Sequence, residues 1–513
     1  MRATKAAPGM TRPRPSSGTR KKVVIVGAGP AGLTAAYELC KVSIPSVVIE
    51  KDDVVGGISR TVNYKGYCFD IGGHRFFTKV EAVDRMWREV LPNGQFLRRD
   101  RLSRIYYNRR FFHYPLRASN ALFGLGIWNS FLILLSYVRA QLSPEMPEKT
   151  FEQWVSNRFG KRLYRTFFKT YTEKVWGIPC DEITADWAAQ RIRGLSLVTA
   201  VKNALIGQST GNKRAVIKTL VDSFDYPAKG PGMMWETVLS QVQAQGCDVR
   251  LQTAVDKIRW RPGGVTSIQV RTNGHCHVIS GTDFISTMPI RELVQRLEPA
   301  APPEVLHAAE RLRYRDFIAV ALVINKGDVF PDNWIYIHDP GVQVGRIQNF
   351  KNWSPHMVPN PDTTCLGMEY FCFEGDHLWT MPDRDLIQLA TDELARIGLA
   401  RADEVTDGAV VRMPKAYPVY DSQHAEALRT VREFLCGLPN LYLVGRNGMH
   451  KYNNQDHSMV TAMLAVRNII GSHYDIWQVN VDQEYHEQSS STTEQDQFAH
   501  LLATQPHVPE RLH

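Results

Sequence analysis

The stretch KVVIVGAGPAGLTAAYELCKVSIPSVVIE, residues 22–50, determines the fold that we expect for this chain. It reads as an apolar strand, a glycine-rich turn, a helix and a second apolar strand that ends in an acid, which together form a βαβ unit. Gly27 permits the tight turn, Gly29 lets the backbone approach a pyrophosphate, and Gly32 lets helix and strand pack closely. Glu50 follows where a carboxylate accepts hydrogen bonds from ribose hydroxyls. The spacing of these parts predicts a dinucleotide-binding domain.

The residues after Glu50 indicate which dinucleotide binds. KDDVVGGISRT, residues 51–61, places Gly56, Gly57 and Arg60 shortly after the acid. This arrangement resembles the second glycine motif of the glutathione-reductase-like FAD proteins. We therefore predict an α/β chain with a Rossmann-like FAD-binding domain of the glutathione-reductase type, and FAD rather than NAD as the cofactor.

Three later segments are further candidates for contact with this cofactor. FDIGGHRFFT (69–78) has two glycines and a histidine, a pattern that lets the backbone come close to an isoalloxazine ring. DVRLQTAVDKI (248–258) resembles the strand whose backbone, here at Val255, meets adenine in this superfamily. NLYLVGRNG (440–448) precedes an amphipathic helix whose N-terminus is expected to face the flavin. Arg446 and Asp456, near that end, are predicted to bind the cofactor.

These pieces are far apart in sequence, so we expect the FAD domain to be assembled from discontinuous segments. Two intervening regions are predicted to carry the substrate: a helical region and a domain with a mixed sheet. The predicted division is a disordered basic tail (1–21), the FAD-binding domain (22–95, 230–300 and 431–475), the helical region (96–229), the sheet-containing substrate domain (301–430) and a polar C-terminal tail (476–513).

Composition excludes fibrous and mainly disordered chains. Of 513 residues, 43% are hydrophobic and 22% are charged, which is ordinary for a globular protein of several domains. The net charge is +9, and seven Lys and Arg residues lie within residues 1–22. Because no basic stripe interleaved with aromatic residues is present, we expect an anionic small molecule and no nucleic acid. The eight cysteines lack metal-ligand spacing, so we expect buried thiols of a cytoplasmic protein and no metal site.

The segment ALFGLGIWNSFLILLSYV, residues 121–138, is about as long as a membrane-spanning helix. Asn129, Ser130 and Ser136 dilute it, and there is no second segment of this kind. A buried or docked helix is therefore favoured, and attachment to one face of a membrane is the alternative.

Seven motifs occur in an order that resembles UDP-galactopyranose mutase, a family within the amine oxidase and protoporphyrinogen oxidase superfamily. They are GGHRFF (72–77), YTEKVWG (171–177), QRI (190–192), RYRDF (313–317), VGRIQNFKNWSP (344–355), AYPV (416–419) and GRNGMHKYNNQDHS (445–458). In that family a reduced flavin attacks the anomeric carbon of the sugar through N5, expels the nucleoside diphosphate, and lets the sugar ring open and reclose. The resemblance implies a nucleotide-sugar substrate, no net oxidation, and NAD(P)H as a possible reductant.

The resemblance also implies roles for individual residues. Two arginines match those that bind the diphosphate, four aromatic residues match those around the diphosphate and sugar, and a histidine matches one beside flavin N5. In that order they are Arg191 and Arg346; Tyr171, Trp176, Tyr314 and Tyr417; and His74. The catalytic residues are thus predicted to be His74, Arg191, Tyr314, Arg346 and Tyr417.

This chain departs from the family at two places, which leaves the substrate open. The segment after Arg191 reads RIRGLSL, where bacterial mutases have a proline and another arginine. CLGMEYFCFEGDHLW (365–379) has no clear counterpart and is expected to line the sugar end of the pocket. The base, the sugar and the oligomeric state are not determined by the sequence.

Two other classes of function compete with the mutase. A net oxidoreductase of the amine oxidase, protoporphyrinogen oxidase or carotenoid desaturase type has the same FAD scaffold, and the apolar segment 121–138 favours it. A redox-sensing protein that binds FAD without catalysis is the third class. The arginine pair favours the mutase.

Overall fold

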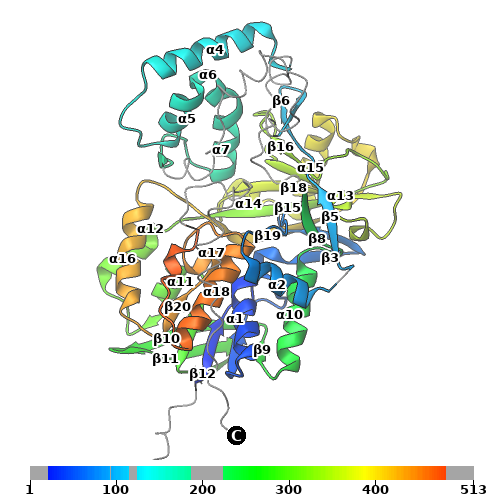
Figure 1. Cartoon of the computed structure of the whole chain (residues 1–513). Coiled ribbons are helices and arrows are strands. Elements are labelled where there is room, and N and C mark those ends of the chain that lie inside the picture. Colours follow the sequence, from blue (N-terminus) through cyan, green and yellow to red (C-terminus); the bar gives the residue numbers. More distant parts are fainter. Residues whose placement is uncertain (1–20, 93, 115–123, 186–222, 481–513) are drawn as a thin grey trace, which may run out of the picture.

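The computed structural model describes residues 21–92, 94–114, 124–185 and 223–480. The basic tail before residue 21, Arg191 with its QRI motif, and the chain after residue 480 therefore lie outside the described residues. In Figure 1 the nucleotide-binding part lies at the bottom, a large sheet crosses the middle, and a group of helices lies at the top.

The predicted βαβ unit forms the centre of a parallel sheet. β1 (Val23–Val26) and β2 (Ser46–Ile49) are buried along their whole length, as expected for strands that are covered on both faces. Every neighbouring pair in this sheet is parallel. The strand order is β20 (Leu441–Leu443), β13 (Asp283–Ser286), β1, β2 and β9 (Asp248–Arg250). The sheet thus joins three distant parts of the chain, which confirms the predicted discontinuous α/β fold.

Helices and a second sheet complete the hydrophobic core of this part. α1 (Pro30–Lys41) packs against α10 (Gly232–Ala244) and α18 (Gln455–Ile469). The second sheet has the order β12 (His275–Ser280), β11 (Gly264–Thr272), β10 (Thr253–Arg261) and β14 (Leu297–Glu298). Ile476 and Val479 are buried in the same core. The packed chain therefore continues past residue 475, where we had placed the start of a polar tail.

A seven-stranded mixed sheet lies next to the nucleotide-binding part (Figure 1). Its order is β19 (Val405–Pro418), β15 (Tyr314–Ile324), β18 (Thr364–Cys372), β17 (Arg346–Asn349), β16 (Trp334–Ile337), β6 (Ser103–Tyr107) and β7 (Arg110–His113). Only the β16–β6 pair is parallel among these strands. β15 and β18 are buried throughout, and α15 (Asp383–Ile397) packs against β15 and β19. This sheet confirms the predicted mixed-sheet part of the fold.

The region 96–229 contains strands as well as the expected helices. β6 and β7 form a hairpin whose turn residues, Asn108 and Arg109, have φ values of 49° and 58°, as a tight two-residue turn requires. β5 (Phe96–Asp100) pairs with β8 (Ser223–Pro227). The sequence predicts a mainly helical region here, and it misses the short β6–β7 hairpin. The β5–β8 and β6–β16 pairings were also missed, because each joins strands more than a hundred residues apart.

The helices of this region form the group at the top of Figure 1. They are α4 (Ile127–Leu142), α5 (Phe151–Phe159), α6 (Lys161–Leu163), the π-helix η2 (Tyr164–Lys169) and α7 (Thr170–Trp176). Within the part of the chain that the structure describes, no helix is both long enough and apolar enough to cross a bilayer.

The cysteines differ in part from the sequence prediction. All eight are free thiols, but Cys276 and Cys436 are exposed rather than buried. Cys276 lies on β12, whose residues are mostly exposed, and Cys436 ends the surface helix α16 (His424–Cys436).

Candidate active site

The first glycine turn is closely packed, and two of its glycines have no room for a side chain. Gly27 has a φ of +100°, and a Cβ there would lie 1.9 Å from the hydroxyl oxygen of Thr287. A Cβ on Gly32 would lie 1.8 Å from the carbonyl oxygen of Gly27. The close contact between helix α1 and the turn therefore depends on Gly32, as the sequence predicted.

The second glycine motif lies against the first and leaves a gap between the two. The nearest atom to a Cβ on Gly29 would be Gly57 Cα, 3.9 Å away, and a Cβ on Gly57 would lie 3.4 Å from Gly29 Cα. The Gly56 amide donates a 2.9 Å hydrogen bond to the carbonyl oxygen of Ala28 and holds the two turns together. Helix α1 begins here, so its positive end faces the gap. Side chains on either turn would fill a space that fits the pyrophosphate of a dinucleotide.

Glu50 is fixed beside this gap by backbone donors. The amides of Ala28 and Asp52 donate hydrogen bonds of 2.7 and 3.0 Å to its carboxylate. Burial raises the pKa of Glu50, although the two backbone hydrogen bonds oppose that shift. The Glu50 carbonyl accepts from the amide of Thr253, two residues before Val255, which brings the start of β10 to the same edge. Arg60 forms a 2.9 Å ion pair with Asp52.

A cavity lies where the nucleotide-binding part meets the large sheet. Its lining includes five residues that we predicted for the site, namely His74, Arg346, Tyr417, Arg446 and Asp456. The remaining lining residues are Ile58, Ile71, Gly72, Gly73, Arg75, Phe77, Phe224, Tyr452, Asn454 and Gln455. Because Asn454, Gln455 and Asp456 mark the beginning of α18, the positive end of that helix also borders the cavity.

His74 is a neutral imidazole in this cavity. Its Nδ1 lies 3.1 Å from the carbonyl oxygen of Gly72, and because a carbonyl can only accept, Nδ1 is the donor. Burial, together with the positive charge of Arg446, lowers the pKa of His74 to about 3. Its Nε2 therefore carries a lone pair and is available as an acceptor.

Arg346 is oriented by Glu369, a residue that our sequence reasoning did not single out. Arg346 Nε donates to one oxygen of the Glu369 carboxylate, and Gln348 Nε2 donates to the other at 2.9 Å. Glu369 lies on β18 directly opposite Arg346 on β17 and is 1% exposed. Burial raises the pKa of Glu369, against the effect of the Arg346 charge. The acid within the apolar stretch 364–372 could have indicated a buried ion pair. The register between β17 and β18, which the sequence does not give, determines that Arg346 is its partner.

An aromatic cluster borders the Arg446 side of the cavity. The rings of Tyr417 and Tyr452 are stacked at 5.6 Å, and the Arg446 guanidinium lies 5.3 and 4.7 Å from their centroids. Trp176 packs edge-on against Tyr417 at 6.1 Å. Arg446 is held by hydrogen bonds to the carbonyls of Asn453 (2.9 Å) and Ala416 (3.0 Å).

Two predicted tyrosines are placed differently. The Tyr171 ring stacks on His338 at 4.5 Å and lies edge-on to Tyr336. Burial raises the pKa of the Tyr171 phenol, and the nearby charge of Arg346 opposes that shift. Tyr314 does not line the cavity: its ring packs edge-on against His450 at 4.6 Å, and its hydroxyl lies 3.5 Å from the Asn447 carbonyl. Tyr314 thus packs within the buried strand β15, and its catalytic role stays a prediction.

The fold and the glycine cradle define a flavoprotein in which a mixed sheet covers the cofactor-binding part. More narrowly, the chain belongs to the family of flavin-containing amine oxidoreductases, whose sequence profile matches residues 30–458. Members of this family use a flavin, so the chain is a flavin-containing enzyme, and the cradle described above fits FAD.

Two solved structures share this fold. A crystal structure of reduced UDP-galactopyranose mutase has a TM-score of 0.78 and 20% identity, covering 90% of this chain and 96% of that chain. Putrescine oxidase bound to putrescine has a TM-score of 0.57 and 17% identity, covering 88% of this chain and 99% of that chain.

Curated relatives match over shorter stretches. The 15-cis-phytoene desaturase of Narcissus pseudonarcissus is 24% identical over 307 residues, which is 54% of this chain and 49% of that protein. The "Probable UDP-galactopyranose mutase" of Klebsiella pneumoniae is 29% identical over 170 residues, which is 32% of this chain and 43% of that protein. This chain thus aligns with about half the length of each.

Substitution of two neighbouring glycines tests the cradle. Gly32→Ala places a Cβ against the Gly27 carbonyl, so we expect the free energy of unfolding to fall by about 2–4 kcal/mol. A Cβ in Gly29→Val would lie 3.9 Å from Gly57 Cα, an ordinary van der Waals distance, so we expect a loss of at most about 1 kcal/mol together with a marked loss of bound FAD. Urea denaturation and the flavin absorbance per protein measure both effects. Full FAD occupancy in Gly29→Val would mean that the pyrophosphate lies elsewhere.

The neutral state of His74 predicts a pH dependence of stability. The unfolded histidine binds a proton near pH 6.5, whereas the folded one stays neutral to about pH 3, so acidification favours the unfolded chain. The glutamine introduced by His74→Gln cannot bind that proton but can still donate to the Gly72 carbonyl. We expect this variant to lose less stability than the wild type between pH 7 and pH 5 in chemical denaturation. An equal loss in both proteins would contradict the assignment.

Proposed function

We propose that this enzyme acts on a nucleoside diphosphate sugar and catalyses a mutase-type rearrangement of the sugar ring with reduced FAD. The observation that carries the proposal is the charge of the cavity. Arg75, Arg346 and Arg446 line it, whereas the acids are Asp456 in the lining and Glu369, the partner of Arg346. An amine substrate is a cation, which this lining disfavours, and an apolar polyene has no group that uses the arginines. A diphosphate gains from both charge and hydrogen bonds.

Arg346 is the proposed anchor of the diphosphate. Its Nε donates a hydrogen bond to Glu369. Its Nη2 lies 3.9 Å from where a Cβ on Gly72 would be, and the His74 ring lies beside the same point. The pair thus fixes the orientation of the guanidinium and leaves its outer nitrogens directed toward the cavity. A planar fork of donors held in this way suits phosphate oxygens better than a flexible ammonium does.

The other residues position the sugar and the leaving group. When bound, reduced FAD supplies the nucleophilic nitrogen for substitution at the anomeric carbon. Arg346 stabilises the diphosphate as the bond from the anomeric carbon to its oxygen breaks, and retains it until that bond forms again. Tyr417 supplies a hydroxyl in the same cavity, and neutral His74 offers Nε2 as an acceptor. A mutase consumes no reductant in turnover, so NAD(P)H, the proposed reductant, would be needed only for the initial reduction.

A net oxidoreductase is the second candidate, and it is favoured by a different observation. Helix α4 carries an exposed apolar face, which would suit an enzyme that takes an apolar substrate from a membrane. The phytoene desaturase relative belongs to that functional type.

The stoichiometry of turnover distinguishes the two candidates. The enzyme is reduced with dithionite under anaerobic conditions and incubated with a panel of UDP-, GDP- and dTDP-sugars. We expect many product molecules per enzyme without further reductant, because a mutase consumes none. One acceptor or nicotinamide consumed per product would exclude the mutase reaction and favour the oxidoreductase.

Nucleotide binding by Arg346 variants tests the anchor. We expect Arg346→Ala to weaken binding of the recognised nucleoside diphosphate by about 1.5–3 kcal/mol in calorimetry, since a charge-assisted hydrogen bond is lost. Arg346→Lys should recover only part of this, because it keeps the charge without the fork.

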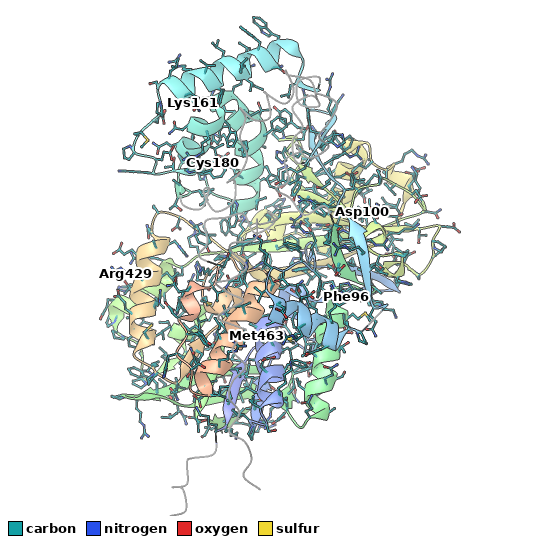
Figure 2. All side chains as sticks on the ribbon, in the orientation of Figure 1. Phe96, Asp100, Lys161, Cys180, Arg429 and Met463 are labelled. Atoms are coloured by element: carbon teal, nitrogen blue, oxygen red, sulfur yellow. The ribbon has the colours of Figure 1, made fainter. Side chains whose placement is uncertain are left out.

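Arg429 provides the matched control. It lies on the surface of α16, as Figure 2 shows, and pairs with Glu433 at 3.0 Å. Arg429→Ala should leave nucleotide affinity and FAD content unchanged. Equal affinity of Arg346→Ala and the wild type would remove Arg346 from the substrate site.

A further inference from the structure

Helix α4 presents an apolar face to solvent at the end of the molecule farthest from the nucleotide-binding part (Figure 1). Trp128 is 71% exposed and Leu142 is 81% exposed, and the rings of Trp128 and Phe131 are stacked at 5.9 Å. The exposed apolar residues of the helix are Trp128, Phe131, Leu134, Leu135, Val138 and Leu142. Large apolar side chains gathered in this way on a protein surface mark an interaction site.

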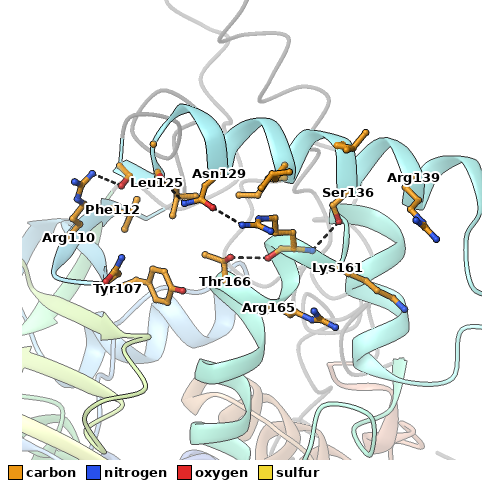
Figure 3. A pocket seen from close by; sticks show the side chains of 17 residues that line it. Tyr107, Arg110, Phe112, Leu125, Asn129, Ser136, Arg139, Lys161, Arg165 and Thr166 are labelled. Carbon is orange, nitrogen blue, oxygen red and sulfur yellow. Dashed lines mark hydrogen bonds between the residues drawn. The ribbon is translucent and has the colours of Figure 1, made fainter.

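The orientation of this face is fixed by the opposite side of the helix. Arg162 donates from its side chain to the Asn129 amide oxygen at 2.7 Å and from its backbone to the Ser136 hydroxyl at 3.1 Å (Figure 3). Gln141 donates to the Asn157 carbonyl at 2.7 Å. Ser130 and Ile133 are buried, and α4 packs on α5 and α6. The polar residues that dilute the apolar segment in the sequence therefore attach the helix to the protein.

Basic side chains lie at the end of α4 and beneath it, and acids are absent from the helix. The sequence from residue 121 to residue 144 contains no Asp or Glu. Arg139, Lys161, Arg162 and Arg165 line a cavity of about 820 Å³ beneath α4 (Figure 3). Lys161 pairs with Glu145 at 2.7 Å, whereas Arg139 and Arg165 form no ion pair with any residue in the described part of the chain.

We propose that this α4 surface attaches the enzyme to one face of a bilayer that contains anionic lipids. The apolar side chains would enter the boundary between headgroups and acyl chains, where Trp is favoured, and Arg139 at the end of the helix would meet lipid phosphates. A helix of 16 residues can lie along the membrane surface and does not have to cross the bilayer. The proposal rests on the α4 surface and does not require the mutase reaction.

The charges favour a lipid surface over a second copy of the chain. In a symmetric dimer built on this face, Arg139 of both copies would lie at one interface with no acid of α4 to balance it. Anionic headgroups supply the missing negative charge and leave the apolar face to the acyl region. Because binding would combine burial of apolar surface with electrostatic attraction, both lipid charge and salt should modulate it.

Co-sedimentation with vesicles tests the attachment. The full-length FAD-bound enzyme is mixed with phosphatidylcholine vesicles with and without phosphatidylglycerol. We expect binding to the mixed vesicles, weakening severalfold as salt rises to about 0.5 M. Trp128→Ser combined with Phe131→Ser should lower the partition coefficient at least about tenfold. Arg139→Gln should weaken the preference for phosphatidylglycerol.

Val278→Ser is the matched control, because Val278 is 54% exposed on β12 at the other end of the molecule (Figure 1). It should bind vesicles as the wild type does, and thermal unfolding should show that all variants are folded. Vesicle binding that is unchanged by Trp128→Ser with Phe131→Ser would overturn the proposal. Absence of vesicle binding, with a dimer in sedimentation velocity that the same substitutions dissociate, would instead assign the face to a second copy.

Discussion

The close approach of the Gly72–Gly73 segment to the large sheet is the constraint on which the candidate site depends. A Cβ on Gly73 would lie 3.0 Å from Gln348 Nε2 and 3.3 Å from the Trp353 ring. Because glycine leaves this space open, the chain after β4 (Tyr67–Asp70) runs directly against β17, and His74 comes to lie opposite Arg346. The nucleotide-binding part and the sheet then share one cavity, and the Arg346–Glu369 pair lies at their junction.

The features of the fold that depend on local geometry could be predicted from the sequence. The turn at Gly27 and Gly32 is specified within one βαβ unit, so its packing followed from spacing alone. Glu369 could not be assigned in this way, because its pairing with Arg346 requires the β17–β18 register. β6 was missed for the same reason, since its parallel partner β16 lies far along the chain. Tyr314 shows the limit of motif matching, because a matched tyrosine does not reveal which way its side chain points.

Membership of the family determines the fold of the chain, whereas the residues of the cavity determine which reaction it catalyses. Mutases, desaturases and amine oxidases share this fold, so function has to be argued from the residues that face the substrate. The lining of the cavity includes three arginines and a histidine held neutral by burial and by a neighbouring cation. An arginine that keeps a buried carboxylate as its partner stays oriented without substrate, so less ordering is required on binding.

The central claim is that a nucleoside diphosphate binds in the same cavity as the flavin. Titration of the FAD-bound enzyme with UDP, GDP and dTDP, followed by the visible absorbance of the flavin, tests it most directly. We predict that at least one of them perturbs the flavin spectrum saturably, with one ligand per FAD. A spectrum unchanged by all three, together with reduction of the flavin by an amine or a polyene, would contradict the account.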